Sequence, residues 1–159
     1  MFNRFLIREI AREKGKSWEI IWNVLMLRLT IASVLFAIFA TSIYFLDQDK
    51  MRLSVILLAC LAVLPQAIAI TFDGIFVALQ KLQFSAISAV ILSIATVFFG
   101  IFLINQGFGV YGAANALVLG QVIYAVVLGL ILYKHWGFRL SSVTVIVMKK
   151  VLLGSLPYG

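Results

Sequence analysis

The stretch Leu53–Gln80 reads LSVILLACLAVLPQAIAITFDGIFVALQ, and Asp73 is its only charged residue. Three other long apolar stretches surround it: Ile20–Leu46, Gln83–Asn105 and Phe108–Tyr133. A helix needs about 20 apolar residues to cross the ~30 Å hydrocarbon core of a membrane, and each stretch reaches that length. The chain is 64% hydrophobic and 12% charged, which leaves too little polar side chain to cover a soluble surface. The sequence therefore predicts an all-α, polytopic membrane protein.

The connections between the four stretches are short, and short connections place neighbouring helices antiparallel. We therefore expect one membrane domain over residues 1–159, built as a four-helix up-down bundle. Residues 134–150 are predicted to be a cytoplasmic segment, and residues 151–159 begin a fifth apolar run. Because that run stops at Pro-Tyr-Gly, we expect a truncated sequence with an incomplete fifth span.

The basic residues predict the orientation of the bundle. In residues 1–19, Arg4, Arg8 and Arg12 recur every four positions, which predicts an amphipathic helix on an anionic cytoplasmic membrane face. Ten Lys and Arg residues lie on the side that holds both ends, and two lie on the other side. This asymmetry predicts a cell-membrane protein with both ends cytoplasmic. Because the basic residues gather at the ends of apolar stretches, the net charge of +7 does not indicate nucleic-acid binding.

The sequence offers little support for catalysis or metal binding. Cys60 is the single cysteine, which excludes an intramolecular disulfide and a cysteine-based metal site. His135 is the single histidine, and beside Trp136 it is predicted to be an interfacial side chain. Serine, histidine and carboxylate residues do not come together in the sequence. We therefore expect no enzyme activity, no catalytic residues, no cofactor and no metal.

Two charged residues inside the predicted spans are candidate functional residues, because a charge in hydrocarbon is costly unless it faces protein or water. Arg28 lies in the first span and Asp73 in the second, about one helical turn closer to the cytoplasm. Two interpretations stay open for Arg28. It either snorkels to the inner headgroups, or it faces inward, where it pairs with Asp73 or lines a cavity.

Uncharged polar residues and small residues add further candidates. Pro65 removes a helical hydrogen bond in the second span, so we expect a kink and a freed carbonyl there. The amides of Gln66, Asn115 and Gln121 either bond to neighbouring helices or line a polar cavity. The small residues that repeat every four positions in the fourth span predict a face packed closely against another helix. These residues are Gly112, Ala116 and Gly120.

Four segments resemble, in the right order, the polysaccharide-flippase branch of the multidrug/oligosaccharidyl-lipid/polysaccharide exporter superfamily. They are REIAREKGKSWEIIWNVLMLRL (Arg8–Leu29), FDGIFVALQKLQFSAIS (Phe72–Ser88), GFGVYGAANALVLGQ (Gly107–Gln121) and the terminal SLPYG. The resemblance covers nearly the whole chain and identifies it with helices three to six of the family's first lobe.

The resemblance implies a transporter that flips a lipid-linked oligosaccharide to the outer leaflet by alternating access. It implies that Arg28 binds the substrate pyrophosphate, because a guanidinium donates two parallel hydrogen bonds. The sugar would contact Gln66, Asn115 and Gln121, and Asp73 is a further candidate without an assigned ion-coupling role. The implied partners are membrane lipids, the lipid-linked oligosaccharide, and the remaining helices of a full-length flippase or another transmembrane partner.

Two other functions stay open. The first is a small independent transporter of the four-helix multidrug type, although such proteins usually carry an acidic residue in the helix that here contains Arg28. The second is a structural membrane assembly protein without transport activity, whose small-residue faces dock partner helices.

Overall fold

The computed structural model of the protein describes residues 17–46 and 50–136, and these residues contain helices and no strand. The helices are α2 (Ser17–Leu46), α3 (Lys50–Leu61), α4 (Val63–Ala78), α5 (Leu82–Leu103) and α6 (Gly109–Trp136), with the π-helical turn η1 (Ile104–Phe108) before α6. The predicted all-α class is confirmed. The predicted amphipathic helix before residue 17, most of the predicted cytoplasmic segment and the fifth apolar run lie outside the described residues.

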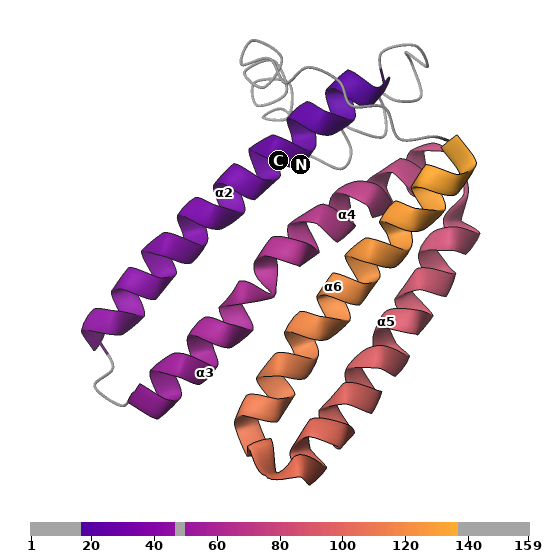
Figure 1. Ribbon diagram of the computed structural model, residues 1–159. Helices are drawn as coiled ribbons and strands as arrows, with labels where there is room; N and C mark the ends of the chain where they lie inside the picture. Colours follow the sequence, from indigo (N-terminus) through magenta and orange to yellow (C-terminus); the bar gives the residue numbers. More distant parts are fainter. Residues whose placement is uncertain (1–16, 47–49, 137–159) are drawn as a thin grey trace.

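Three described stretches are long and apolar enough to cross a membrane: Ile21–Phe45, Met51–Ala78 and Leu82–His135. The third holds 54 residues. As one straight helix it would be about 80 Å long, far beyond the ~30 Å hydrocarbon core. The chain instead reverses at η1, where Gly107 and Gly109 adopt φ angles of +87° and +51°. The third stretch is therefore a hairpin of two helices, α5 and α6 (Figure 1).

The helices alternate in direction and lie side by side in the order α2, α3–α4, α6, α5 (Figure 1). The chain passes from α4 to α5 and then returns with α6, which packs between them. As a result, α3–α4 and α6 run parallel to each other, whereas α2 and α5 run in the opposite direction.

The second membrane-spanning stretch is interrupted near its middle, between Leu61 and Val63. Pro65 has no N–H to donate to the Leu61 carbonyl, and its ring clashes with that carbonyl in an unbroken helix. The chain relieves this clash at Ala62, whose N–H donates to the Ala59 carbonyl at 3.2 Å, three residues back instead of four. The kink that Pro65 predicts is therefore present.

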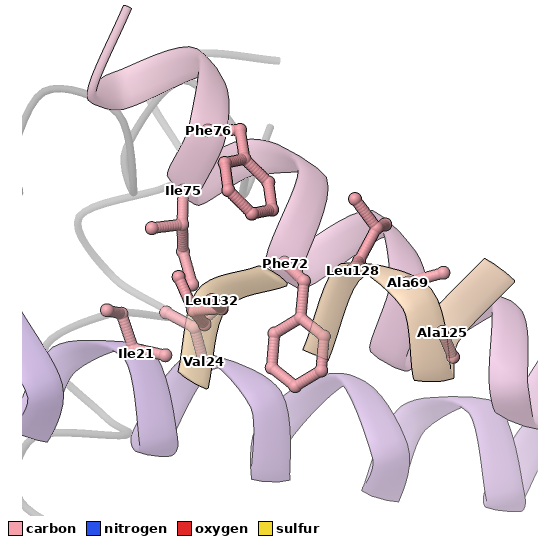
Figure 2. Close-up of a cluster of buried hydrophobic side chains, with 9 residues drawn as sticks. All are labelled: Ile21, Val24, Ala69, Phe72, Ile75, Phe76, Ala125, Leu128 and Leu132. Carbon is pink, nitrogen blue, oxygen red and sulfur yellow. The ribbon is translucent and has the colours of Figure 1, made fainter. Parts of the chain in front are cut away.

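A cluster of buried apolar side chains joins α2, α4 and α6 (Figure 2). Its members are Ile21 and Val24 of α2, Ala69, Phe72, Ile75 and Phe76 of α4, and Ala125, Leu128 and Leu132 of α6. The ring of Phe72 lies between the ribbons of α2 and α6. Because Ile21 is near the start of α2 and Phe76 near the end of α4, the cluster lies at the predicted cytoplasmic end of the bundle.

The turn between α4 and α5 is compact because α4 ends in a Schellman motif. The Lys81 N–H donates to the Phe76 carbonyl at 2.8 Å, and the Gln80 N–H donates to the Val77 carbonyl at 3.1 Å. Gln80 occupies the left-handed position of the motif, with a φ of +56°. The turn brings Phe84 of α5 to a ring-centroid distance of 5.8 Å from Phe76.

Candidate functional site

Arg28 is half-buried on α2 and faces α4. Its Nη1 donates to the Thr71 hydroxyl at 3.2 Å. Thr71 is fully buried, and its own hydroxyl proton goes to the Ala67 carbonyl at 2.9 Å. The hydroxyl oxygen therefore serves as the acceptor for the guanidinium, which orients Arg28 toward the space between α2 and α4.

Asp73 contacts α5 and α6 instead. The Ser85 hydroxyl at the start of α5 donates to the Asp73 carboxylate. The Tyr124 hydroxyl of α6 also interacts with both the Ser85 hydroxyl and the Asp73 carboxylate. These three residues form a polar cluster that joins α4, α5 and α6. Ser85 lies in the first turn of α5, where the positive end of the helix dipole favours a nearby carboxylate.

The separate partners of Arg28 and Asp73 follow from the rotation of α4. Thr71 and Asp73 are two residues apart, and such residues point to nearly opposite sides of a helix. One side of α4 faces α2 and the other faces α5 and α6. The structure therefore gives Arg28 and Asp73 different partners on opposite sides of α4.

The three candidate amides have different surroundings. Gln66 is exposed. The Asn115 side chain donates to the Tyr111 carbonyl of its own helix at 3.0 Å. The Oε1 atom of Gln121 is buried and accepts no hydrogen bond from the described part of the chain. No described hydrogen bond joins these amides to one another, and their common role in binding a sugar stays a prediction.

Gly112, Ala116 and Gly120 of α6 face α5 and are buried there. A Cβ added to Gly112 would lie 3.0 Å from the Leu103 backbone carbon, and one added to Gly100 would lie 3.8 Å from the Ala116 Cβ. A Cβ on Gly120 would collide with the Thr96 hydroxyl. The small residues therefore allow the backbones of α5 and α6 to approach closely.

Sequence reasoning missed several of the polar residues that the structure places between helices: Asn23, Thr71, Ser85 and Tyr124. Asn23 is fully buried on α2, where its amide donates to the Glu19 carbonyl at 2.7 Å. Uncharged polar residues are common in membrane helices and often bond to their own backbone, so the sequence alone does not mark them.

Comparisons with known proteins place the chain in a family. Searches of curated proteins and of solved structures returned no match. A family model described as polysaccharide biosynthesis protein matches residues 2–159, which is nearly the entire chain. The chain, a multi-pass membrane protein by its helices, therefore belongs to the polysaccharide biosynthesis protein family.

Proposed function

We propose that this protein takes part in moving a lipid-linked oligosaccharide across the membrane during polysaccharide biosynthesis, by alternating access. Its family membership supports a role in making polysaccharide, and its long apolar helices place that role in the membrane. A hydrated oligosaccharide cannot cross hydrocarbon unaided, because its hydroxyl groups lose their hydrogen bonds to water. A membrane protein of this family therefore suits the transport step.

The observation that carries this proposal is the position of Arg28. It lies seven residues after Ile21, where the first apolar span begins, and so about 10 Å inside that span. Its bond to Thr71 holds the guanidinium between α2 and α4. A lipid-linked oligosaccharide carries its phosphate groups where lipid and sugar meet. A guanidinium binds phosphate oxygens through two parallel hydrogen bonds, so Arg28 is the residue we assign to that contact.

Arg28→Ala should abolish glycan export in cells while the protein accumulates normally in the membrane. Arg28→Lys should restore only part of the export, because an ammonium keeps the charge but lacks the planar fork. Arg52→Ala is the matched control, since Arg52 is an exposed cation near the start of α3 and should be dispensable. Full export by Arg28→Ala would refute the assignment. Equal export by the Lys and Arg proteins, with Ala impairing insertion, would show that Arg28 only snorkels.

We also propose that both ends of the chain are cytoplasmic, because ten Lys and Arg residues lie on that side and two on the other. The two turns of the bundle test this orientation in a Cys60→Ala background. Gln106→Cys, in the exposed turn η1, should react with a membrane-impermeant maleimide added to intact cells. Lys81→Cys, in the exposed turn before α5, should react only after the membrane is opened. The reverse pattern would invert the topology.

The assembly alternative depended on a small-residue face that docks a partner helix. That face of α6 already contacts α5 within this chain, so it gives no support to docking of another protein. The transport proposal is therefore the better supported of the two.

A further inference from the structure

The buried Oε1 atom of Gln121 requires a hydrogen-bond donor that the described part of the chain does not supply. An unsatisfied acceptor in a membrane interior is costly. The helix that carries Gln121 cannot supply the donor, because the backbone N–H groups within α6 are already used in its own ladder. Asn115 differs, because neither of its amide atoms is a buried atom without a hydrogen-bond partner, and its NH₂ group donates to a carbonyl of its own helix.

Gln121 lies on the face of α6 that packs against α4. Ala125, Leu128 and Leu132 follow it by four, seven and eleven positions, and residues at these spacings share one face of a helix. All three belong to the cluster that contacts Phe72 and Phe76 of α4. The amide therefore belongs to the same contact face, farther from the cytoplasmic end.

Two contacts determine which part of the second span lies opposite Gln121. The Tyr111 hydroxyl donates to the Met51 carbonyl at 3.3 Å, which is a numbering offset of 60 between the two spans. A Cβ on Gly129 would lie 3.3 Å from Phe72, which is an offset of 57. Because α3–α4 and α6 run parallel, Gln121 lies level with residues 61–64. This is the interruption between α3 and α4.

The interruption presents a second acceptor. Pro65 has no N–H for the Leu61 carbonyl, so the regular helical donor for that oxygen is missing. The Gln121 Oε1 and the Leu61 carbonyl are both neutral acceptors, and a molecule between them must donate twice without bringing a charge. Water meets this requirement, because its two O–H groups can each serve one acceptor.

We propose that one buried water molecule binds between Gln121 and the α3–α4 interruption, donating to the Gln121 Oε1 and to the Leu61 carbonyl. The water replaces the hydrogen bond that Pro65 removes and links the broken span to α6. This inference does not depend on the substrate proposed above.

The substitution Gln121→Leu, made in the full chain, tests the site. The sign of the change in Tm, measured in detergent, decides between a dry and a water-bound Oε1. A dry Oε1 would be a buried, unsatisfied acceptor, so its replacement by Leu would raise the Tm. With the water present, Gln121→Leu removes the acceptor that holds it, so the Leu61 carbonyl loses its donor when the water leaves. The Tm should then fall by about 2–8 °C. Asn115→Leu also replaces a side-chain amide of α6 by Leu and should lower the Tm by less. In a Pro65→Ala background, where residue 65 can again donate to Leu61, the loss from Gln121→Leu should shrink.

X-ray hydroxyl-radical labelling of the unsubstituted protein gives a second measurement that does not depend on folding of a variant. Radiolysis of a bound water should oxidise Leu64 and Pro65 more strongly than Ile68, a similarly half-buried residue on the same helix. Equal labelling, or a rise in Tm for Gln121→Leu, would overturn the proposal. If the Tm is higher in sodium than in choline, and Gln121→Leu removes this difference, the site binds a cation instead of a water molecule.

Discussion

The α5–α6 hairpin and helix α2 pack against the rest of the protein in contrasting ways. Along the hairpin, small residues of α6 bring its backbone close to α5 from Gly112 to Gly120. Helix α2 is buried mainly at its N-terminal end, where Val24 is fully buried. Its C-terminal half is open, and Leu35 and Phe39 are 55% and 60% exposed.

This difference follows from how helices associate in lipid. Lipid tails are as apolar as leucine, so burying a large apolar side chain gives little net gain, whereas close backbone contact and polar bonds between helices do stabilise the bundle. The hairpin has such backbone contact over much of its length. Helix α2 has the apolar cluster at one end and the Arg28–Thr71 hydrogen bond, so we expect it to separate from the bundle before the hairpin opens.

The largest effect should come from a side chain added at the tightest point of the hairpin. Gly120→Ala places a Cβ against the Thr96 hydroxyl, and we expect a loss of about 1–3 kcal/mol in unfolding free energy. Gly120→Leu should prevent recovery of folded protein in detergent. Thermal unfolding of purified protein would measure the effect of Gly120→Ala, and the yield of folded protein in detergent would measure that of Gly120→Leu.

Two variants make this prediction specific to the Gly120 contact. Gly100→Ala adds a Cβ at an ordinary 3.8 Å contact and should leave the stability nearly unchanged. Thr96→Ala removes the hydroxyl that the new Cβ meets, so it should rescue Gly120→Ala. An unchanged Tm for Gly120→Ala would show that α5 and α6 do not approach as closely as described.

The same substitution at two positions of α2 should show that this helix is held by one end. Val24→Ala leaves a cavity at a fully buried position, and because the surrounding side chains lose van der Waals contacts we expect a loss of about 1–2 kcal/mol. Val34→Ala acts at a 53% exposed position and should cost much less. Chemical unfolding in mixed detergent micelles can compare the two variants. Equal losses would show that the C-terminal half of α2 is as firmly packed as the N-terminal half.

Much of this fold could be predicted from the sequence, because membrane insertion depends on apolar length and on few other properties. The apolar stretches predicted an all-α membrane protein, and the helices confirm that class. The missing N–H of Pro65 predicted the interruption of the second span. The sequence does not show which helices lie next to each other, and in the structure α6 lies between α4 and α5.

The polar contacts between helices were harder to predict, because they also depend on how the helices are arranged. Residue numbers give the depth of a side chain in the membrane, and by depth alone Arg28 and Asp73 can pair. Partner choice also depends on the rotation of each helix about its axis, which follows from packing of apolar faces. Rotation of α4 presents Thr71 to α2 and Asp73 to α5 and α6. Charges in the span were therefore visible in the sequence, but their neutral partners were not.

The smallest predicted effect concerns the turn between α4 and α5, which precedes the α5–α6 hairpin. Gln80 adopts a φ of +56° in the Schellman motif, a conformation that glycine reaches without the steric cost of a Cβ. Gln80→Gly should therefore stabilise the protein by about 0.5–1 kcal/mol, even after the extra chain entropy of glycine in the unfolded state. Lys81→Gly is the matched control, because Lys81 is also exposed but has a φ of −107°, so glycine there should only destabilise. Gln80→Val should destabilise as well, since a β-branched side chain is strained at positive φ. Unfolding titrations of the three variants would compare them, and a loss of stability in Gln80→Gly would show that the Gln80 side chain contributes more to this turn than its strained backbone costs.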